Sequence, residues 1–114
     1  MNDKETSERG DLLRGALEML ILRTLDEGAM HGFGITEALR ARSEEVLAVD
    51  EGSMYPALYR MQRRGWIAAE WGRSENNRRA KFYALTDEGR QQLGAASARW
   101  DRFSQAVGRV MDTA

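Results

Sequence analysis

The chain of 114 residues suits one domain, and its 42% hydrophobic and 31% charged residues are typical of a folded globular protein rather than a disordered one. Cysteine is absent, which excludes disulfides and thiolate chemistry. No apolar run approaches the length of a membrane span, and the polar start Met1–Asp11 lacks the apolar core of a signal peptide, so we expect a cytoplasmic protein.

The formal net charge of −1 argues at first against nucleic acid as a partner, but the charges are unevenly distributed. The segment Arg60–Lys81 holds seven cationic and two acidic side chains, a difference of +5, which leaves −6 for the rest of the chain. A basic segment in an acidic protein is typical of a nucleic-acid footprint, with a solvated surface as the alternative.

The segment Asp11–Leu25 predicts a first helix, with Asp11 as its N-cap and Gly28 as its stop. Its apolar side chains occupy nearly every face, so more than one neighbour must cover it, and a second subunit is one candidate. A shorter second helix follows Met30–Gly32 and is predicted to end at about Ser43.

A third helix is predicted to begin near Ser53, its expected N-cap, and to end at Gly65. Pro56 would then fall in the first turn, where its missing N–H removes no helical hydrogen bond. One face is predicted to be buried because its apolar residues recur at helical spacing; these are Met54, Leu58 and Met61. Aromatic and cationic side chains on the other faces suit a helix that lies on a polyanion.

Two short strands are predicted at Trp66–Arg73 and Arg79–Leu85, because both segments are rich in aromatic residues. The connector Ser74–Arg78 has the composition of a hairpin loop, since asparagine adopts the positive φ that a tight turn requires. Arg78 and Arg79 lie at or near the tip of this hairpin. Considered alone, they fit a solvated face as well as they fit a bound polyanion.

A final helix is predicted from Thr86, its N-cap, to about Met111, with Asp87 and Glu88 favoured by the dipole of its first turn. Its apolar residues recur in alternating steps of three and four and form a heptad seam. The seam consists of Leu93, Ala96, Trp100, Phe103, Val107 and Val110. Packing on the chain's own domain is the alternative, but a small body covers only part of so long a helix, so we predict contact between subunits.

Three helices, a basic hairpin and a long helix are the order of a winged helix-turn-helix protein, in which one helix enters the major groove and the hairpin contacts the flanking backbone. Between about Leu12 and Leu93, several runs match a known pattern: Leu17–Leu22, Met30–Ile35, Glu51–Met61, Arg64–Ile67, Asn77–Tyr83 and Leu85–Gly89. These runs resemble the PadR-like transcriptional regulators, and the single C-terminal helix resembles the short subgroup of that family.

The resemblance implies a set of DNA-binding residues on the third helix and the hairpin. They are Ser53, Tyr55, Pro56, Tyr59, Arg63, Arg78, Arg79 and Lys81. Ser53 and Tyr55 would donate hydrogen bonds to phosphates, with help from the free N–H groups of the helix N-terminus. Tyr59 and Arg63 would reach base edges, although half-buried packing is the alternative for both tyrosines. Phe33 stands where the family often has tyrosine, which removes a phenolic contact.

The resemblance also implies a homodimeric repressor of a near-palindromic operator in double-stranded DNA, with recognition helices about 34 Å apart. Members of the subgroup dimerise through the first and last helices, and the expected contacts are Leu17, Leu93, Ala96, Trp100, Phe103, Val107 and Val110. Some members bind flat aromatic or drug-like molecules between facing C-terminal helices. Trp100 and Phe103 are therefore candidates for a small aromatic effector, with simple filling of the dimer core as the alternative.

No pattern indicates catalysis, a metal or a cofactor, so we expect none of them. His31 is the only histidine and is interpreted as a structural residue at the start of the second helix. Ser53 has no histidine or lysine base at a suitable spacing and is not interpreted as a nucleophile. A polar connector spans Glu44–Glu51, and its carboxylates are interpreted as solvated surface.

The predicted fold is therefore mainly α with a small β-hairpin, a winged helix-turn-helix with a long C-terminal dimerisation helix. The expected organisation is a tail over residues 1–10, a DNA-binding domain over 11–85 and the dimerisation helix over 86–114. Two other classes of function stay open: a winged-helix module that binds an acidic protein partner, and a ligand carrier with no role at DNA.

Overall fold

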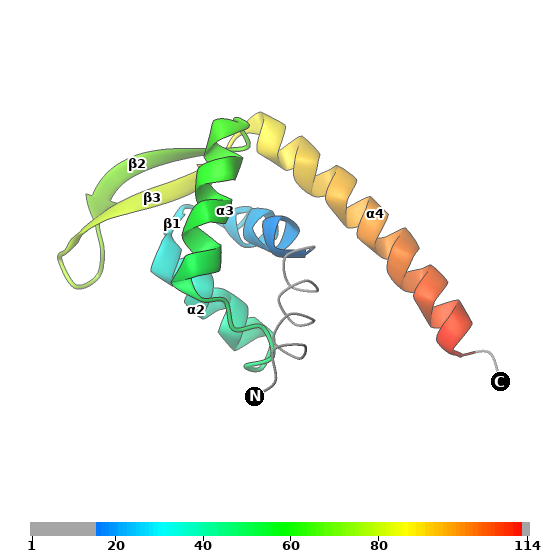
Figure 1. Ribbon diagram of the computed structural model, residues 1–114. Coiled ribbons are helices and arrows are strands. Elements are labelled where there is room, and N and C mark those ends of the chain that lie inside the picture. The colour runs from blue at the N-terminus through cyan, green and yellow to red at the C-terminus, as the bar shows by residue number, and fades with distance from the viewer. Residues whose placement is uncertain (1–15, 113–114) are drawn as a thin grey trace.

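The computed structural model describes residues 16–112 and confirms the predicted fold class, a mainly helical body with a small sheet and a long C-terminal helix (Figure 1). The chain is helical over residues 16–25, hereafter the N-terminal helix. The predicted cap Asp11 lies outside the described residues. The elements that follow are β1 (Met30–His31), α2 (Gly32–Arg42), α3 (Glu51–Arg63), β2 (Ile67–Arg73), β3 (Arg79–Leu85) and α4 (Asp87–Met111).

The hydrophobic core lies where the N-terminal helix, α2 and α3 meet. Met54, Leu58 and Met61, whose spacing predicted a buried face of α3, are all 0% exposed. Ile21 of the N-terminal helix and Ile35 of α2 are equally buried. Each side chain of this size stabilises the fold by about 1.5–3 kcal/mol when it is fully removed from water. Because the core uses one face of α3, the opposite face of that helix is left at the surface.

The sheet contains a short strand, β1, that the sequence did not predict. It pairs with β3, so the strand order is β1-β3-β2 and all pairs are antiparallel. Two residues are too few for an alternating pattern, and β1 forms because β3 offers it an edge. The predicted structural role of His31 is confirmed, since its Nδ1 accepts a hydrogen bond from the Gly34 N–H at 2.9 Å and caps α2.

α3 begins earlier than predicted, and its N-cap is Asp50 rather than Ser53. The Asp50 carboxylate accepts a hydrogen bond from the Ser53 N–H at 2.8 Å. Aspartate and serine cap helices about equally well, so the local sequence did not decide between them. As a consequence Pro56 lies in the second turn, where it has no N–H to donate to the carbonyl of Gly52. Asp50, interpreted as a solvated carboxylate, thus has a structural role.

Ion pairs on the surface fix the end of α2. Arg42 pairs with Glu27, which follows the N-terminal helix, and its hydrogen bond holds the pKa of the Glu27 carboxyl below the usual value. Arg40 pairs with Glu45 at 2.8 Å, so this connector carboxylate is also partnered rather than merely solvated, and the pair raises the pKa of the Arg40 guanidinium. Exposed pairs of this kind contribute little stability, but they order the connector that leads into α3.

The start of α4 is bonded to the junction between α3 and β2. Thr86 caps α4, as predicted, because its Oγ1 accepts from the Gly89 N–H at 3.0 Å. The same hydroxyl donates to the Gly65 carbonyl at 2.6 Å, and the Thr86 N–H donates to the Trp66 carbonyl at 3.1 Å. Gly89 packs directly on this carbonyl, where any Cβ would overlap the Trp66 oxygen. Backbone contacts therefore set the direction in which α4 leaves the body.

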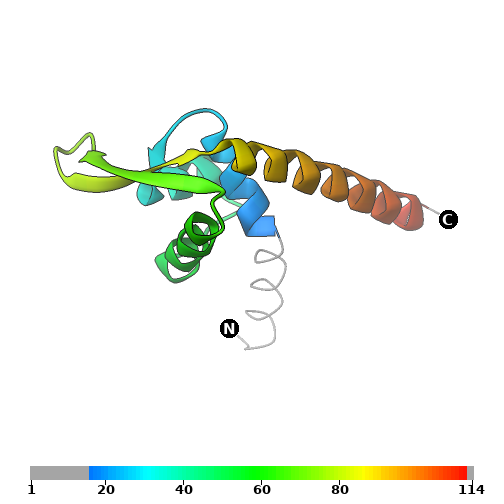
Figure 2. The same ribbon diagram turned by 90° about the horizontal axis from the view of Figure 1, so that it is seen from above.

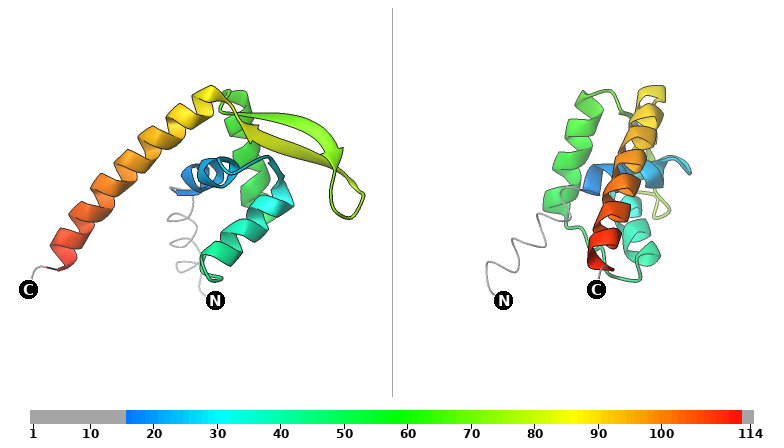
Figure 3. Two further views of the ribbon diagram at one scale, coloured as in Figure 1. Left: turned by 180° about the vertical axis from the view of Figure 1, so that it is seen from behind. Right: turned by 90° about the vertical axis from the view of Figure 1, so that its right-hand side faces the viewer.

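Toward its C-terminus α4 extends away from the rest of the described residues. Figure 2 and the left view of Figure 3 show α4 and the β2–β3 hairpin projecting from opposite ends of the helical body. The molecule is accordingly 55 Å long and 37 Å wide. Every residue from Ala98 to Val107 is exposed. The C-terminal half of α4 thus contributes almost nothing to the core of its own protomer.

Candidate nucleic-acid interface

α3 presents a ridge of exposed side chains on the face opposite the core, as expected for the helix that carries most of the predicted DNA-binding residues. This α3 ridge consists of Gly52, Pro56, Tyr59 and Arg63, all of them exposed. Ser53 and Tyr55 are also exposed and lie on its two flanks. The five residues predicted on this helix are therefore all at one accessible surface. The Ser53 N–H is already bonded to Asp50, so it is the Ser53 hydroxyl that is left to bind a ligand.

The side chains of Tyr59 and Arg63 contact each other on the α3 ridge. The guanidinium carbon of Arg63 lies 5.7 Å from the centroid of the Tyr59 ring, and Nη1 donates to the phenol oxygen at 3.5 Å. Tyr59 is 61% exposed, which excludes it from the core. A guanidinium that rests on a ring keeps its planar fork of donors, the geometry that matches paired acceptors on guanine.

Tyr55 connects α3 to α2 and to the sheet. Its ring lies so close to Gly32 that a Cβ at this glycine would come within 2.8 Å of a ring carbon. Burial raises the pKa of the Tyr83 phenol, and the charge of the neighbouring Tyr55 adds to the rise. With 45% of its surface exposed, Tyr55 both packs between elements and reaches the surface, so neither interpretation of this tyrosine excludes the other.

The β2–β3 hairpin, hereafter the wing, has one cationic face. Strand side chains alternate between faces, and the register pairs Trp71 with Lys81 and Arg73 with Arg79. These four side chains therefore share the face on which Tyr83 meets the body. Arg73 and Arg79 lie directly opposite each other, and neither forms a salt bridge with any residue between 16 and 112. Like charges in this position repel each other. Because no acidic side chain pairs with either arginine in this range, the wing carries uncompensated positive charge.

Trp71 is a candidate site residue that the sequence pattern did not single out. It is 58% exposed, and the guanidinium carbon of Arg79 lies 4.5 Å from the centroid of its ring. Lys81 extends over the Tyr83 ring at 5.8 Å in the same way. The aromatic content of the wing was visible in the sequence. The strand register that places Trp71 beside Arg79 was not.

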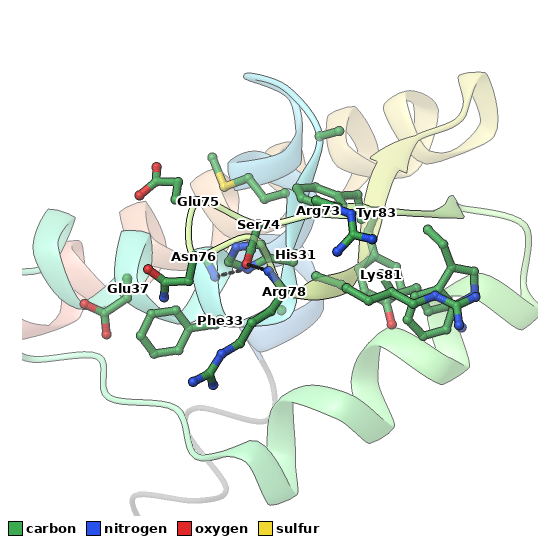
Figure 4. Close-up of a pocket in the computed structure, with 18 of the residues that line it drawn as sticks. His31, Phe33, Glu37, Arg73, Ser74, Glu75, Asn76, Arg78, Lys81 and Tyr83 are labelled. Carbon is green, nitrogen blue, oxygen red and sulfur yellow. Dashed lines mark hydrogen bonds between the residues drawn. The ribbon is translucent and has the colours of Figure 1, made fainter.

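A groove of about 980 Å³ separates the wing from the start of α2 (Figure 4). Asn76 and Arg78 of the wing loop line this groove together with His31 and Phe33, and Figure 4 labels all four. Phe33 is 64% exposed, so the missing phenolic oxygen leaves an apolar ring at the surface. The groove thus brings cations of the wing and an aromatic residue of α2 to the same side of the molecule.

Two arginines of the basic segment belong to another surface. Arg60 and Arg64 lie on the flank of α3 that faces the N-terminal helix, where the Glu18 carboxylate accepts from them at 3.4 Å and 3.1 Å. Arg64 also lies over the Trp66 ring at 5.0 Å. Part of the positive charge that marked this segment is therefore compensated within the chain. Within residues 16–112, the cations of this segment that form no salt bridge are those of the α3 ridge and the wing.

The predicted seam on α4 lies at the surface in its distal part. Trp100, Phe103, Val107 and Val110 are between 42% and 72% exposed, and the rings of Trp100 and Phe103 are 6.1 Å apart. Leu93 and Ala96 are half-buried. Leu17 is 3% exposed and packs in the core of its own protomer, so a second subunit would find almost none of it accessible.

A small hollow of about 210 Å³ lies between the N-terminal helix and α4. It is lined by Met19, Ala96, Arg99, Trp100 and Phe103. The sequence did not predict Met19 and Arg99 as residues of an effector site. Their position beside Trp100 depends on how the N-terminal helix and α4 pack. The hollow includes both residues expected to meet an aromatic effector.

Residues 16–112 contain no cluster of three or more potential metal ligands. In the same range, no helix is long and apolar enough to cross a membrane.

Comparison with known proteins agrees with this geometry. The model of the "Transcriptional regulator PadR-like family" matches residues 21–95, which include α2, α3, the wing and the first turns of α4. A PadR-like transcriptional regulator from Bacillus cereus has 29% identical residues, and the match covers 91% of this chain and 99% of that one with a TM-score of 0.79. A PadR family transcriptional regulator from Eggerthella lenta is 28% identical, with coverages of 98% and 96% and a TM-score of 0.80. An uncharacterised protein of Lysinibacillus sphaericus is 24% identical over 91% of this chain and 95% of its own length.

Proposed function

The chain belongs to the PadR-like family of transcriptional regulators, and from this premise we propose that it is a homodimeric repressor that binds a near-palindromic operator in double-stranded DNA. The observation that carries the proposal is one continuous surface. It runs from the α3 ridge to the exposed Tyr55, which lines the same groove as Trp71, Arg73, Arg79 and Lys81 on the cationic face of the wing. We place the protein in the cytoplasm, where this surface meets DNA.

In this proposal α3 enters the major groove and the wing contacts the flanking backbone. Arg63, held on Tyr59, reads base edges, while the hydroxyls of Ser53 and Tyr55 bind phosphates. Asp50 already occupies the cap, so phosphate binding at this end of α3 depends more on side-chain hydroxyls than on the helix N-terminus. Arg78, Arg79 and Lys81 of the wing supply the charge that attracts the backbone.

The distal seam of α4 supports the dimer. A run of exposed apolar side chains on a helix is costly in water, and a second copy of the same helix would cover it. We further propose that a flat aromatic effector binds where Trp100 and Phe103 of two protomers face each other and releases the repressor from DNA. The hollow beside Met19 would then be one half of that site.

Titration of the purified protein against the DNA upstream of its own gene tests the DNA-binding function. We expect tight binding whose affinity falls by at least about 100-fold between roughly 50 and 200 mM salt, because several phosphates are neutralised. Failure to bind any upstream fragment, or binding that does not respond to salt, would contradict the proposal. Capture of an acidic protein by the same surface in place of DNA would favour an interaction module instead.

The wing is tested by the double variant Arg78→Ala/Arg79→Ala. Affinity should fall by the same factor for the operator and for an unrelated duplex, since phosphate contacts carry no sequence information. The slope of log affinity against log salt should also decrease by about one for each arginine lost. A double variant that binds like the parent would remove the wing from the interface.

Arg63→Ala is expected to weaken operator binding by about 1–3 kcal/mol and to relax the base preference at one position of each half-site. Arg60→Ala is the matched control, because it removes the same charge from the same helix on the flank where Glu18 already compensates it. Selection of bound duplexes from a random pool measures the base preference of each of the two variants. Equal preferences for the two variants would show that Arg63 reads no base.

A further inference from the structure

We propose that Trp71 is a positioning residue for DNA binding: its indole ring holds the Arg79 guanidinium in place on the wing so that Arg79 binds a backbone phosphate. The inference rests on the DNA-binding function proposed above. It adds a residue outside the set that the family resemblance assigned, and it gives that residue a role through Arg79 rather than through a contact of its own.

The geometry of the wing brings the two side chains together. Trp71 pairs with Lys81 in the strand register, and Arg79 lies two residues before Lys81 on the same face of β3. The Arg79 guanidinium carbon is 4.5 Å from the centre of the indole, well within the range of a cation–π contact. Trp71 is 58% exposed, so packing against the core does not account for a ring of this size at this position.

Electrostatics explain why Arg79 needs a support. Its cross-strand partner is Arg73, whose Nη1 donates to the Asn77 carbonyl at 3.2 Å and is thereby held at the wing loop. Two guanidinium groups directly opposite each other repel, and a free Arg79 would turn away from Arg73 and lose its position. The indole face offers an attractive place that offsets this repulsion. Because neither arginine pairs with an acid in residues 16–112, a phosphate is the group that compensates the remaining charge.

A stacked guanidinium is also better prepared to bind phosphate than a mobile one. Where the ring contacts the face of the planar group, the N–H donors at its edge stay available for two phosphate oxygens. Arginine otherwise loses much rotamer freedom when it binds, and the stack removes part of this cost in advance. Trp71 thus acts before DNA arrives, by limiting the directions in which Arg79 points.

A double-mutant cycle tests the proposal in the full-length protein. Trp71→Ala, Arg79→Ala and the combined variant are titrated against the operator and against an unrelated duplex of equal length. We expect Trp71→Ala to lose about threefold in affinity for each wing, or about tenfold for a dimer, and to lose it equally on both duplexes. In the Arg79→Ala background, Trp71→Ala should cause no further loss, because it acts only through the arginine.

Two conservative variants separate positioning from simple support of the hairpin. Trp71→Phe keeps a ring face and should retain most of the affinity. Arg79→Lys keeps the charge but not the planar group, and should lose about as much as Trp71→Ala. Circular dichroism of each variant shows whether the protein is folded under the binding conditions, and only folded variants enter the cycle.

Independent losses from Trp71→Ala and Arg79→Ala would overturn the positioning role and indicate that Trp71 touches DNA itself. A loss confined to the operator would overturn the phosphate assignment in favour of base readout. The parent protein is titrated alongside. If it binds no duplex, the proposed function and this inference both fail, whereas a parent that binds and a Trp71→Ala variant that binds equally well overturn the role of Trp71 alone.

Discussion

Replacing Gly89 with alanine is expected to lower the free energy of unfolding by about 3 kcal/mol, the upper part of the range for an overpacked site. The added Cβ would overlap the carbonyl oxygen of Trp66, which is backbone and cannot rotate away. To make room, α4 must move off the junction between α3 and β2. This movement also weakens the hydrogen bonds that Thr86 makes to Gly65 and Trp66, so two contributions to stability are lost together.

Urea unfolding followed by far-ultraviolet circular dichroism measures this loss. Gly94→Ala is the matched control, because Gly94 lies on the same helix and a Cβ there meets nothing within 4 Å. Removing an exposed glycine from a helix interior should leave the stability unchanged or raise it by up to about 1 kcal/mol. Equal midpoints for Gly89→Ala and the parent would mean that the junction yields easily and does not set the direction of α4.

Replacing Trp100 with aspartate is expected to weaken self-association by at least about 100-fold, because a carboxylate without a partner would be buried between apolar side chains. The protomer should stay folded, since Trp100 lies outside the hydrophobic core and is 48% exposed. Operator affinity should fall with the dimer, as one half-site alone provides half of the contacts. Sedimentation equilibrium measures the association, and the operator titration measures its consequence.

Ala98→Asp is the control for this prediction. Ala98 is exposed on the face of α4 opposite the seam, so the same new charge should leave both association and DNA binding nearly unchanged. If Trp100→Asp and Ala98→Asp sediment alike, as dimers or as monomers, the seam is not the contact between subunits. A parent that is a stable folded monomer at micromolar concentration would remove the dimer from the proposal.

Much of the architecture could be predicted because it depends on local patterns. The spacing of Met54, Leu58 and Met61 identified the buried face of α3, and by exclusion the exposed face on which Tyr59 and Arg63 lie. The cap at the start of α4 was equally visible, since Thr86 precedes two acidic residues and a long helical pattern. These features rest on contacts between residues at most four positions apart, which the order of residues determines directly.

Local sequence patterns did not predict features that depend on contacts made only in the folded protein. Asp50 and Ser53 are both good N-caps, and only the packed helix shows that Asp50 accepts the N–H of Ser53. β1 has two residues and no pattern, and it exists because β3 supplies a partner some fifty positions later in the chain. The predicted start of α3, the turn assigned to Pro56 and the number of strands were therefore wrong for the same reason.

The candidate interface shows the same division. The sequence by itself determined that the segment Arg60–Lys81 is basic, that α3 turns cationic and aromatic side chains outward, and that an apolar seam runs along α4. Only the tertiary structure decided which cations stay uncompensated, because Glu18 is distant in sequence from Arg60 and Arg64 yet pairs with both. It also placed Trp71 under Arg79 through the register of two strands. Charge and periodicity are properties of the chain, whereas the pairing of distant side chains depends on how the elements pack.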